Sequence, residues 1–281
     1  MKSNRKISFI IITLIYILAT ILGVLLSVYL PFNIYLNIFV VDVIATIFVF
    51  IFSLIFKNAS VYDPYWSVQP MVIVLGLFFT RDVTLSRVLA AIAVSLWGVR
   101  LTANWAYTFR NLNHQDWRYT MLKEKTGMFY PIINFVGIHL VPTLVVFLCC
   151  LPLMFLFENN NYTNVGTIIF FTCAILSVIL QGVSDITMHK YKKNRKTPFI
   201  RDGVWKYSRH PNYLAEILMW WSVGLLCVSS LTGYLYILIG AAANTMLFMF
   251  VSIPLAEGKQ AKKEGFLEYK KATRILLPIK K

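Results

Sequence analysis

The chain contains a succession of apolar stretches, most of them close to the length of about 20 residues that an α-helix needs to cross the hydrocarbon core of a bilayer. Hydrophobic residues make up 58% of the 281 positions, and the mean hydropathy is +0.67. This composition is typical of an integral membrane protein and not of a soluble one. We therefore predict an all-α, polytopic transmembrane bundle of about seven to eight spans.

The predicted spans follow one another without an internal repeat or a soluble insertion, so we expect a single membrane domain over residues 1–281, in which residues 1–60 supply the N-terminal spans. The third stretch is short, and we expect it to be tilted, partial or re-entrant. The apolar stretches are Ile7–Leu30, Ile34–Phe56, Val68–Phe79, Val83–Phe109, Pro131–Phe157, Val165–Thr187, Tyr213–Ser230 and Tyr234–Ile253.

Positive charge is concentrated in alternate loops. If the N-terminus faces the cytoplasm, 24 of the 27 Lys and Arg residues fall on the cytoplasmic side. This agrees with the positive-inside rule and places both termini in the cytoplasm after an even number of crossings. The formal net charge of +15 thus comes from the loops of an apolar chain, so it does not indicate a nucleic-acid partner. Membrane lipid is therefore one expected partner, and a lipid-soluble small molecule is what the family resemblance given below implies.

The segment 203–216, GVWKYSRHPNYLAE, carries more polar chemistry into a predicted span than anchoring requires. Arg209 can pair with a phosphate through a bidentate fork. Pro211 suits the first turn of a helix, and Asn212 and Glu216 would then lie four residues apart on one face. A juxtamembrane belt of basic and aromatic residues is the alternative explanation, but it does not account for Asn212 and Glu216.

The string YSRHPNYLAE, followed by WW, resembles the C-terminal motif of the steroid 5-alpha-reductase-like membrane proteins, and in particular their bacterial-type branch, which is often labelled only as a domain of unknown function. The similarity continues through other segments and covers most of residues 61–281. These segments are DPYWS (63–67), NWAYTFR (104–110), HQDWRYTMLKEKTG (114–127), GIHLVPT (137–143) and EYKKAT (268–273).

The resemblance implies an NADPH-dependent oxidoreductase that acts on a carbon–carbon double bond, with a cofactor site mainly in residues 181–281. Asn212 and Glu216 would lie at the nicotinamide end of that site, and an acidic residue at position 185 would help to hold the cofactor. The residues expected at the cofactor are Asp185, Lys192, Arg195, Tyr207, Arg209, His210, Asn212, Tyr213, Glu216 and Glu257.

Two of these acidic residues also have simpler explanations. Asp185 can be an interfacial, water-exposed residue at the end of its helix. Glu257 can be a charge at a helix end that balances the neighbouring lysines, although it can also accept hydrogen bonds from a ribose or from Arg209. The lysines of 259–271 fit ordinary positive-inside charge and attraction to anionic lipid.

Reduction of an enone requires a hydride, a donor that polarises the carbonyl group, and a proton for the α-carbon. The better-known steroid reductases supply an acidic residue and a tyrosine from their N-terminal half, and this sequence departs from their pattern there. The local candidates are Asp63, Tyr65, Tyr107 and His139, of which we prefer Tyr107 as the catalytic proton donor. We expect no metal.

Two other functions fit the sequence. Membrane methyltransferases of the isoprenylcysteine type, which use S-adenosylmethionine, share the RHPNY-like turn and a downstream glutamate. A non-catalytic scaffold or lipid-binding protein would need neither cofactor. Stabilisation of the purified protein by NADPH, by S-adenosylmethionine or by neither distinguishes the three.

We predict a cytoplasmic C-terminus and a cytoplasmic loop over residues 110–130, because the basic residues of both segments favour that side. Topology reporters fused after Lys281 and inserted into that loop check this in cells. Activity of either reporter only on the outer side would contradict the predicted orientation.

Overall fold

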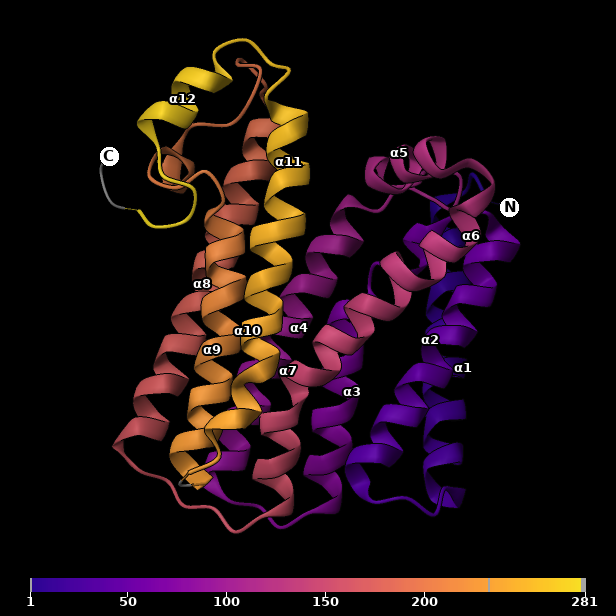
Figure 1. Cartoon of the computed structure of the whole chain (residues 1–281), viewed down its shortest axis with the longest axis vertical. Coiled ribbons are helices and arrows are strands. Elements are labelled where there is room, and N and C mark those ends of the chain that lie inside the picture. The colour runs from indigo at the N-terminus through magenta and orange to yellow at the C-terminus, as the bar shows by residue number, and fades with distance from the viewer. Residues whose placement is uncertain (1, 232, 279–281) are drawn as a thin grey trace. The chain divides into compact units, whose positions relative to one another are not determined.

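The structure is a computed structural model and describes residues 2–231 and 233–278. Helices dominate it, and no β-strand occurs in these residues. Figure 1 labels the α-helices, which are α1 (Arg5–Tyr29), α2 (Ile34–Phe56), α3 (Tyr65–Thr80), α4 (Leu85–Thr108), α5 (Trp117–Thr126), α6 (Tyr130–Ile133), α7 (Val141–Glu158), α8 (Val165–Lys193), α9 (Pro211–Leu231), α10 (Ile239–Leu247), α11 (Ile253–Gln260) and α12 (Phe266–Ala272).

Seven helical segments of the described chain are long and apolar enough to cross a membrane. The predicted all-α, polytopic bundle of about seven to eight spans is thus confirmed, and the chain is an integral, multi-pass membrane protein. The segments are Arg5–Tyr29, Ile34–Phe56, Leu85–Thr108, Trp117–Glu158, Val165–Lys193, Pro211–Leu231 and Leu235–Gln260.

The doubtful third stretch forms helix α3, which has 16 residues and is not among the seven. At 1.5 Å per residue it is about 24 Å long, shorter than the hydrocarbon core of about 30 Å. The even number of crossings that the loop charges predict requires α3 to count as an eighth crossing.

The chain divides into two compact units, which are described separately below. Unit 1 comprises Met1–Asp82 and Trp97–Met154. Unit 2 comprises Val83–Leu96 and Phe155–Lys281. Helix α4 and helix α7 each contribute residues to both.

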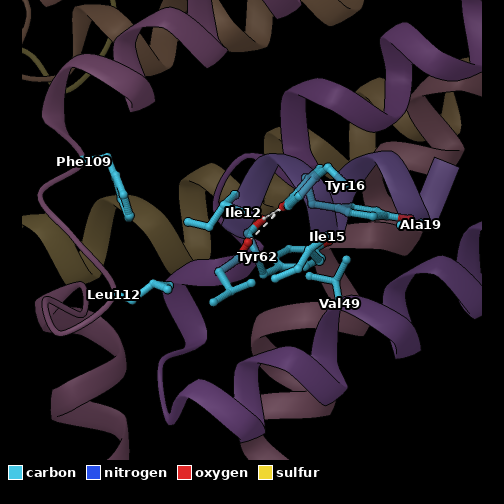
Figure 2. Packing of buried hydrophobic residues seen from close by; sticks show 10 residues of the cluster. Ile12, Ile15, Tyr16, Ala19, Val49, Tyr62, Phe109 and Leu112 are labelled. Atoms are coloured by element: carbon cyan, nitrogen blue, oxygen red, sulfur yellow. Dashed lines mark hydrogen bonds between the residues drawn. The ribbon is translucent and has the colours of Figure 1, made fainter. Parts of the chain in front are cut away.

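Unit 1 is built around the packing of α1, α2 and the 3₁₀ turn Ala59–Tyr62 that follows α2. Figure 2 shows the apolar cluster at this place, in which Ile12 and Ile15 of α1 face Tyr62. The hydroxyl group of Tyr16 is directed at the carbonyl oxygens of Val61, at 3.0 Å, and Tyr62, at 3.2 Å. This contact fixes the turn that leads into α3.

The long apolar stretch predicted over Pro131–Phe157 is a continuous helical segment that contains a π-helical turn, Asn134–Leu140. His139 lies in this turn and is fully buried. Its Nδ1 is 2.9 Å from the carbonyl oxygen of Asn134, and its ring packs against Tyr62. A π-turn leaves a backbone carbonyl outside the regular helical hydrogen-bond pattern, and here that carbonyl, of Asn134, is hydrogen-bonded to His139.

Unit 2 is organised by the antiparallel pair α8 and α9, which lie side by side in Figure 1. Helix α8 opens with a capping box, in which Asn164 accepts from the backbone of Thr167 and the Thr167 side chain accepts from the backbone of Asn164. The Thr167 hydroxyl group also lies 2.9 Å from that of Ser230, near the end of α9. The cap therefore joins the start of one helix to the end of the other.

Arg87 is a buried cation in the part of α4 that belongs to unit 2, and it is 7% exposed. Its guanidinium donates to the backbone carbonyls of Leu156, Phe157 and Asn159 at 2.8–3.1 Å. These carbonyls belong to the C-terminal end of α7, where the helix itself offers them no donor and where a positive charge is favoured.

Replacing Arg87 by methionine should therefore destabilise the protein, because a hydrogen bond from a charged group contributes about 1.5–3 kcal/mol. The measurement is the thermal unfolding midpoint of the purified protein in detergent. Arg201→Met, at an exposed position, is the matched control. An Arg87→Met variant as stable as this control would contradict the anchoring role.

Candidate functional site

Arg209 joins the segment before α9 to the C-terminal part of unit 2. Its Nε donates to Glu257 Oε1 of α11 at 2.6 Å. Its Nη1 donates to the backbone carbonyls of Lys270 and Thr273, and Lys270 Nζ pairs with Glu257 Oε2 at 2.8 Å. The side chains of Arg209 and Glu257 are 6% and 9% exposed. This confirms the predicted alternative that Glu257 accepts a hydrogen bond from Arg209. The Nε and Nη1 groups of Arg209 are engaged in these contacts, although the sequence led us to expect the guanidinium to pair with a phosphate.

Backbone contacts reinforce the same connection. The N–H group of Arg209 donates to the carbonyl of Arg274 at 3.0 Å, and Ser208 and Arg274 form an isolated parallel bridge. The hydroxyl group of Tyr269 donates to the carbonyl of Trp205. Burial raises the pKa of Tyr269 to about 12, so this hydroxyl group keeps its proton at neutral pH. Residues 266–276 therefore close over the segment that precedes α9.

His210 and Tyr213 form a flat pair at the start of α9, with ring centroids 5.2 Å apart and an interplanar angle of 4°. Burial lowers the pKa of His210 to about 4, although the neighbouring Glu257 acts in the opposite direction. The imidazole is thus neutral at pH 7. Its Nε2 lies 3.4 Å from Glu257 Oε1 but makes no hydrogen bond with it.

Glu216 lies in α9, five residues after the helix opens at Pro211 as the sequence predicts. Gln181 of α8 donates its Nε2 to Glu216 Oε2 at 2.8 Å. Trp220, one turn further along α9, donates its indole N–H to Oε1 at 3.0 Å. Both carboxylate oxygens are therefore held by side chains, so the orientation of Glu216 is fixed.

Several polar atoms of unit 2 are buried without a partner. They are Gln181 Oε1, His210 Nε2, Asn212 Oδ1, Asn244 Nδ2 and Gln260 Oε1. The set contains amide acceptors, an amide donor and a neutral imidazole nitrogen, on α8, on α10, on α11 and at the start of α9. A buried polar atom without a partner costs about 1–3 kcal/mol, so each is a reason to expect a ligand or an ordered water.

The remaining residues expected at the cofactor lie nearer the surface of unit 2. Asp185 is half-buried in α8, one turn after Gln181. Lys192 near the end of α8, Arg195 just beyond it, and Tyr207 are exposed. Arg195 donates to the carbonyl of Pro198 at 3.1 Å, which shapes the loop after α8. Lys192, Arg195 and Tyr207 therefore form an outer, exposed group, whereas Asp185 is half-buried as Glu216 is.

Unit 1 holds a groove of about 310 Å³ between α1, α2 and α3. Its lining is largely apolar, with Ala19, Val41 and Leu77 among its members. The chemistry of such a lining suits the hydrocarbon part of a lipid-soluble molecule.

A buried polar cluster lies in the wall of this groove. The Tyr65 hydroxyl group donates to Asp42 Oδ1 at 2.7 Å, and Gln69 Nε2 donates to Asp42 Oδ2 at 2.8 Å. Asp42 is 4% exposed and lies in a predicted membrane span. A carboxylate at such a position is costly, and its two donors offset part of that cost.

Tyr107, the preferred proton donor, is 69% exposed and is not among the residues that line the groove. Of the other tyrosine and histidine candidates, only Tyr65 lines it. Asp63 lies at the start of α3 and accepts from the Tyr119 hydroxyl group at 2.7 Å. Burial raises the pKa of Asp63 to about 6, against the lowering effect of Arg118. The proton-donor assignment stays a prediction.

Sequence reasoning assigned no role to four residues that the structure makes prominent, namely Asp42, Gln69, Gln181 and Trp220. Asp42 had an available signal, because an ionisable residue within an apolar span is by default a functional hypothesis. Gln181 offered a similar signal, because it is a polar residue within an apolar span. The indole of Trp220 carries no such signal, because tryptophan is ordinary in a membrane helix.

Comparison with known proteins gives a family and no activity. The family model described as "Protein of unknown function (DUF1295)" matches residues 49–273. An uncharacterised protein of Schizosaccharomyces pombe (strain 972) is 24% identical over 195 residues, which cover 59% of this chain and 56% of that protein. The chain thus aligns with little more than half of the length of that relative. No solved structure matches the chain. Because the family model spans most of the sequence, the chain belongs to the DUF1295 family.

Proposed function

We propose that this protein is an NADPH-dependent membrane oxidoreductase that reduces a carbon–carbon double bond in a lipid-soluble substrate, such as an enone of steroid or isoprenoid type. The similarity of segment 203–216 and its companions to the steroid 5-alpha-reductase-like proteins is the starting point. The observation that carries the proposal is the fixed carboxylate of Glu216 in the same unit as unpartnered amide atoms.

The buried polar atoms of unit 2 fit the nicotinamide end of such a cofactor. A carboxamide group offers one acceptor and two donors. Glu216, Asn212 and Gln181 present acceptor oxygens, and Asn244 presents a donor. The carboxylate is already oriented by Gln181 and Trp220, so binding would not have to order it. These residues would hold the carboxamide and fix which face of the ring is presented.

The outer group of unit 2 fits the phosphate end. Residues 188–212 carry eight Lys and Arg residues against Asp202 alone, and Lys192 and Arg195 are exposed within them. Exposed cations attract a polyanion and favour the additional phosphate of NADPH over NADH. Arg209 contributes differently, because its guanidinium holds Glu257 and the carbonyls of the C-terminal segment. We assign Arg209 and Glu257 a positioning role at this site.

NADPH, when bound, supplies a hydride to the substrate's double bond. The apolar lining of the unit 1 groove is the surface that we propose for the hydrocarbon part of the substrate. Tyr65 and Asp42 form a donor–acceptor pair in the wall of that groove, and we propose the phenol of Tyr65 as the proton donor. Tyr107 remains the alternative proton donor, outside the groove.

Replacing Asn212 by alanine or Glu216 by glutamine should weaken NADPH binding more than it lowers the stability of the ligand-free protein. A hydrogen bond to a charged group contributes about 1.5–3 kcal/mol, and misplacing a reacting group by about 1 Å can slow a reaction roughly a hundredfold. We expect NADPH affinity to fall at least about tenfold in each variant. The measurements are NADPH affinity by titration and the unfolding midpoint without ligand.

Asn160→Ala, in the exposed loop before α8, is the control for the asparagine substitution. Loss of ligand-free stability with unchanged NADPH affinity would show that Asn212 and Glu216 only hold helices together. That result would remove both from the proposed site.

A further inference from the structure

The groove of unit 1 contains two buried side-chain oxygens that have no hydrogen-bond donor. They are Asn37 Oδ1 on α2 and Gln69 Oε1 on α3. Both residues line the groove, and they are 8% and 7% exposed. The groove therefore combines an apolar lining with two hydrogen-bond acceptors that the protein leaves open.

The orientation of the Asn37 amide follows from its surroundings. Its Nδ2 donates to the backbone carbonyl of Ser27 at 2.8 Å. Rotating the amide by half a turn would set two acceptor oxygens against each other, so the nitrogen is held at Ser27. The oxygen is consequently the atom that remains without a partner.

The same reasoning applies to Gln69. Its Nε2 donates to Asp42 Oδ2 at 2.8 Å, while Tyr65 donates to Asp42 Oδ1. An ionised carboxylate only accepts, so the nitrogen of Gln69 faces Asp42 while Asp42 is ionised. Gln69 Oε1 is thus fixed as an open acceptor beside the Asp42–Tyr65 pair.

A buried acceptor without a donor costs about 1–3 kcal/mol, and lipid tails cannot supply one. A ligand that brings a donor removes this cost, whereas a ketone, an ether or a hydrocarbon of the same shape leaves it in place. A site whose polar groups must be paired rejects the analogue that lacks the matching group. The open atoms therefore select for O–H or N–H groups.

We propose that the unit 1 groove binds a lipid-soluble alcohol, whose hydroxyl group donates to Gln69 Oε1 or Asn37 Oδ1 while its hydrocarbon part lies on the apolar lining. As a statement about the substrate, this rests on the proposed function and adds that the reducible lipid carries a hydroxyl group.

The test compares farnesol with farnesyl methyl ether, in which a methyl group replaces the hydroxyl hydrogen, with the full-length protein in nanodiscs and without cofactor. We expect farnesol to bind at least about tenfold more tightly than the ether. Asn37→Leu or Gln69→Met should bring the two affinities to within about twofold, and the variant that does so identifies the acceptor. Asn113→Leu, an exposed asparagine of the same unit, should keep the preference.

Equal affinities for the two probes in the wild-type protein would overturn the proposal, as would an undiminished preference in both variants. Gln69→Met also removes a donor from Asp42 and can impair folding, whereas Asn37→Leu leaves the Asp42 cluster intact. NADPH binding is measured separately on the same samples. If farnesol is not preferred but NADPH still binds, only this inference is rejected. If farnesol is preferred but NADPH does not bind, only the proposed cofactor is rejected.

Discussion

Polar groups buried in a membrane protein must find their partners within the chain, because the hydrocarbon core supplies none. Arg87 meets this requirement by donating to the carbonyls at the end of α7, and Asp42 does so by accepting from Tyr65 and Gln69. Glu216 is satisfied in the same way by Gln181 and Trp220. Where such a network leaves a buried polar atom without a hydrogen-bond partner, that atom is a candidate contact for a ligand or an ordered water.

The two units use this principle for different chemistry. In unit 2 the open atoms accompany a fixed carboxylate and a neutral imidazole, with exposed cations on the loop after α8. In unit 1 the open atoms are two acceptors in an apolar groove. The first combination suits a polar, phosphorylated cofactor, and the second suits an amphiphile with a hydrogen-bond donor.

The C-terminal segment contributes to unit 2 in a way that explains its basic and aromatic composition. Tyr269 donates to Trp205 in the segment before α9, and Lys270 pairs with Glu257 of α11, so residues that resemble an anchoring aromatic and a surface charge make structural contacts within unit 2. Arg209 lies at the centre of these contacts. The conformation of the RHPNY turn thus depends on a segment some 60 residues further along the chain.

Apolar length predicted most of the fold, because crossing a bilayer fixes the size of each helix. The stretch Ile34–Phe56 even matches α2 at both ends. Side-chain pairing was harder to predict, because the contact of Glu216 with Gln181 depends on how α8 and α9 pack and not on sequence spacing. Glu257 illustrates this, since its sequence position allowed a ribose, Arg209 or nearby lysines, and the structure gives it Arg209 and Lys270.

The most direct measurement for the central claim is the thermal stability of the purified protein with NADPH, NADH and S-adenosylmethionine in separate titrations. A ligand that binds only the folded state adds about 2.7 kcal/mol at 100 times its dissociation constant. The account predicts a rise in the unfolding midpoint with NADPH, a smaller rise with NADH at the same concentration, and none with S-adenosylmethionine. Stabilisation by S-adenosylmethionine alone, or by none of the three, would contradict it.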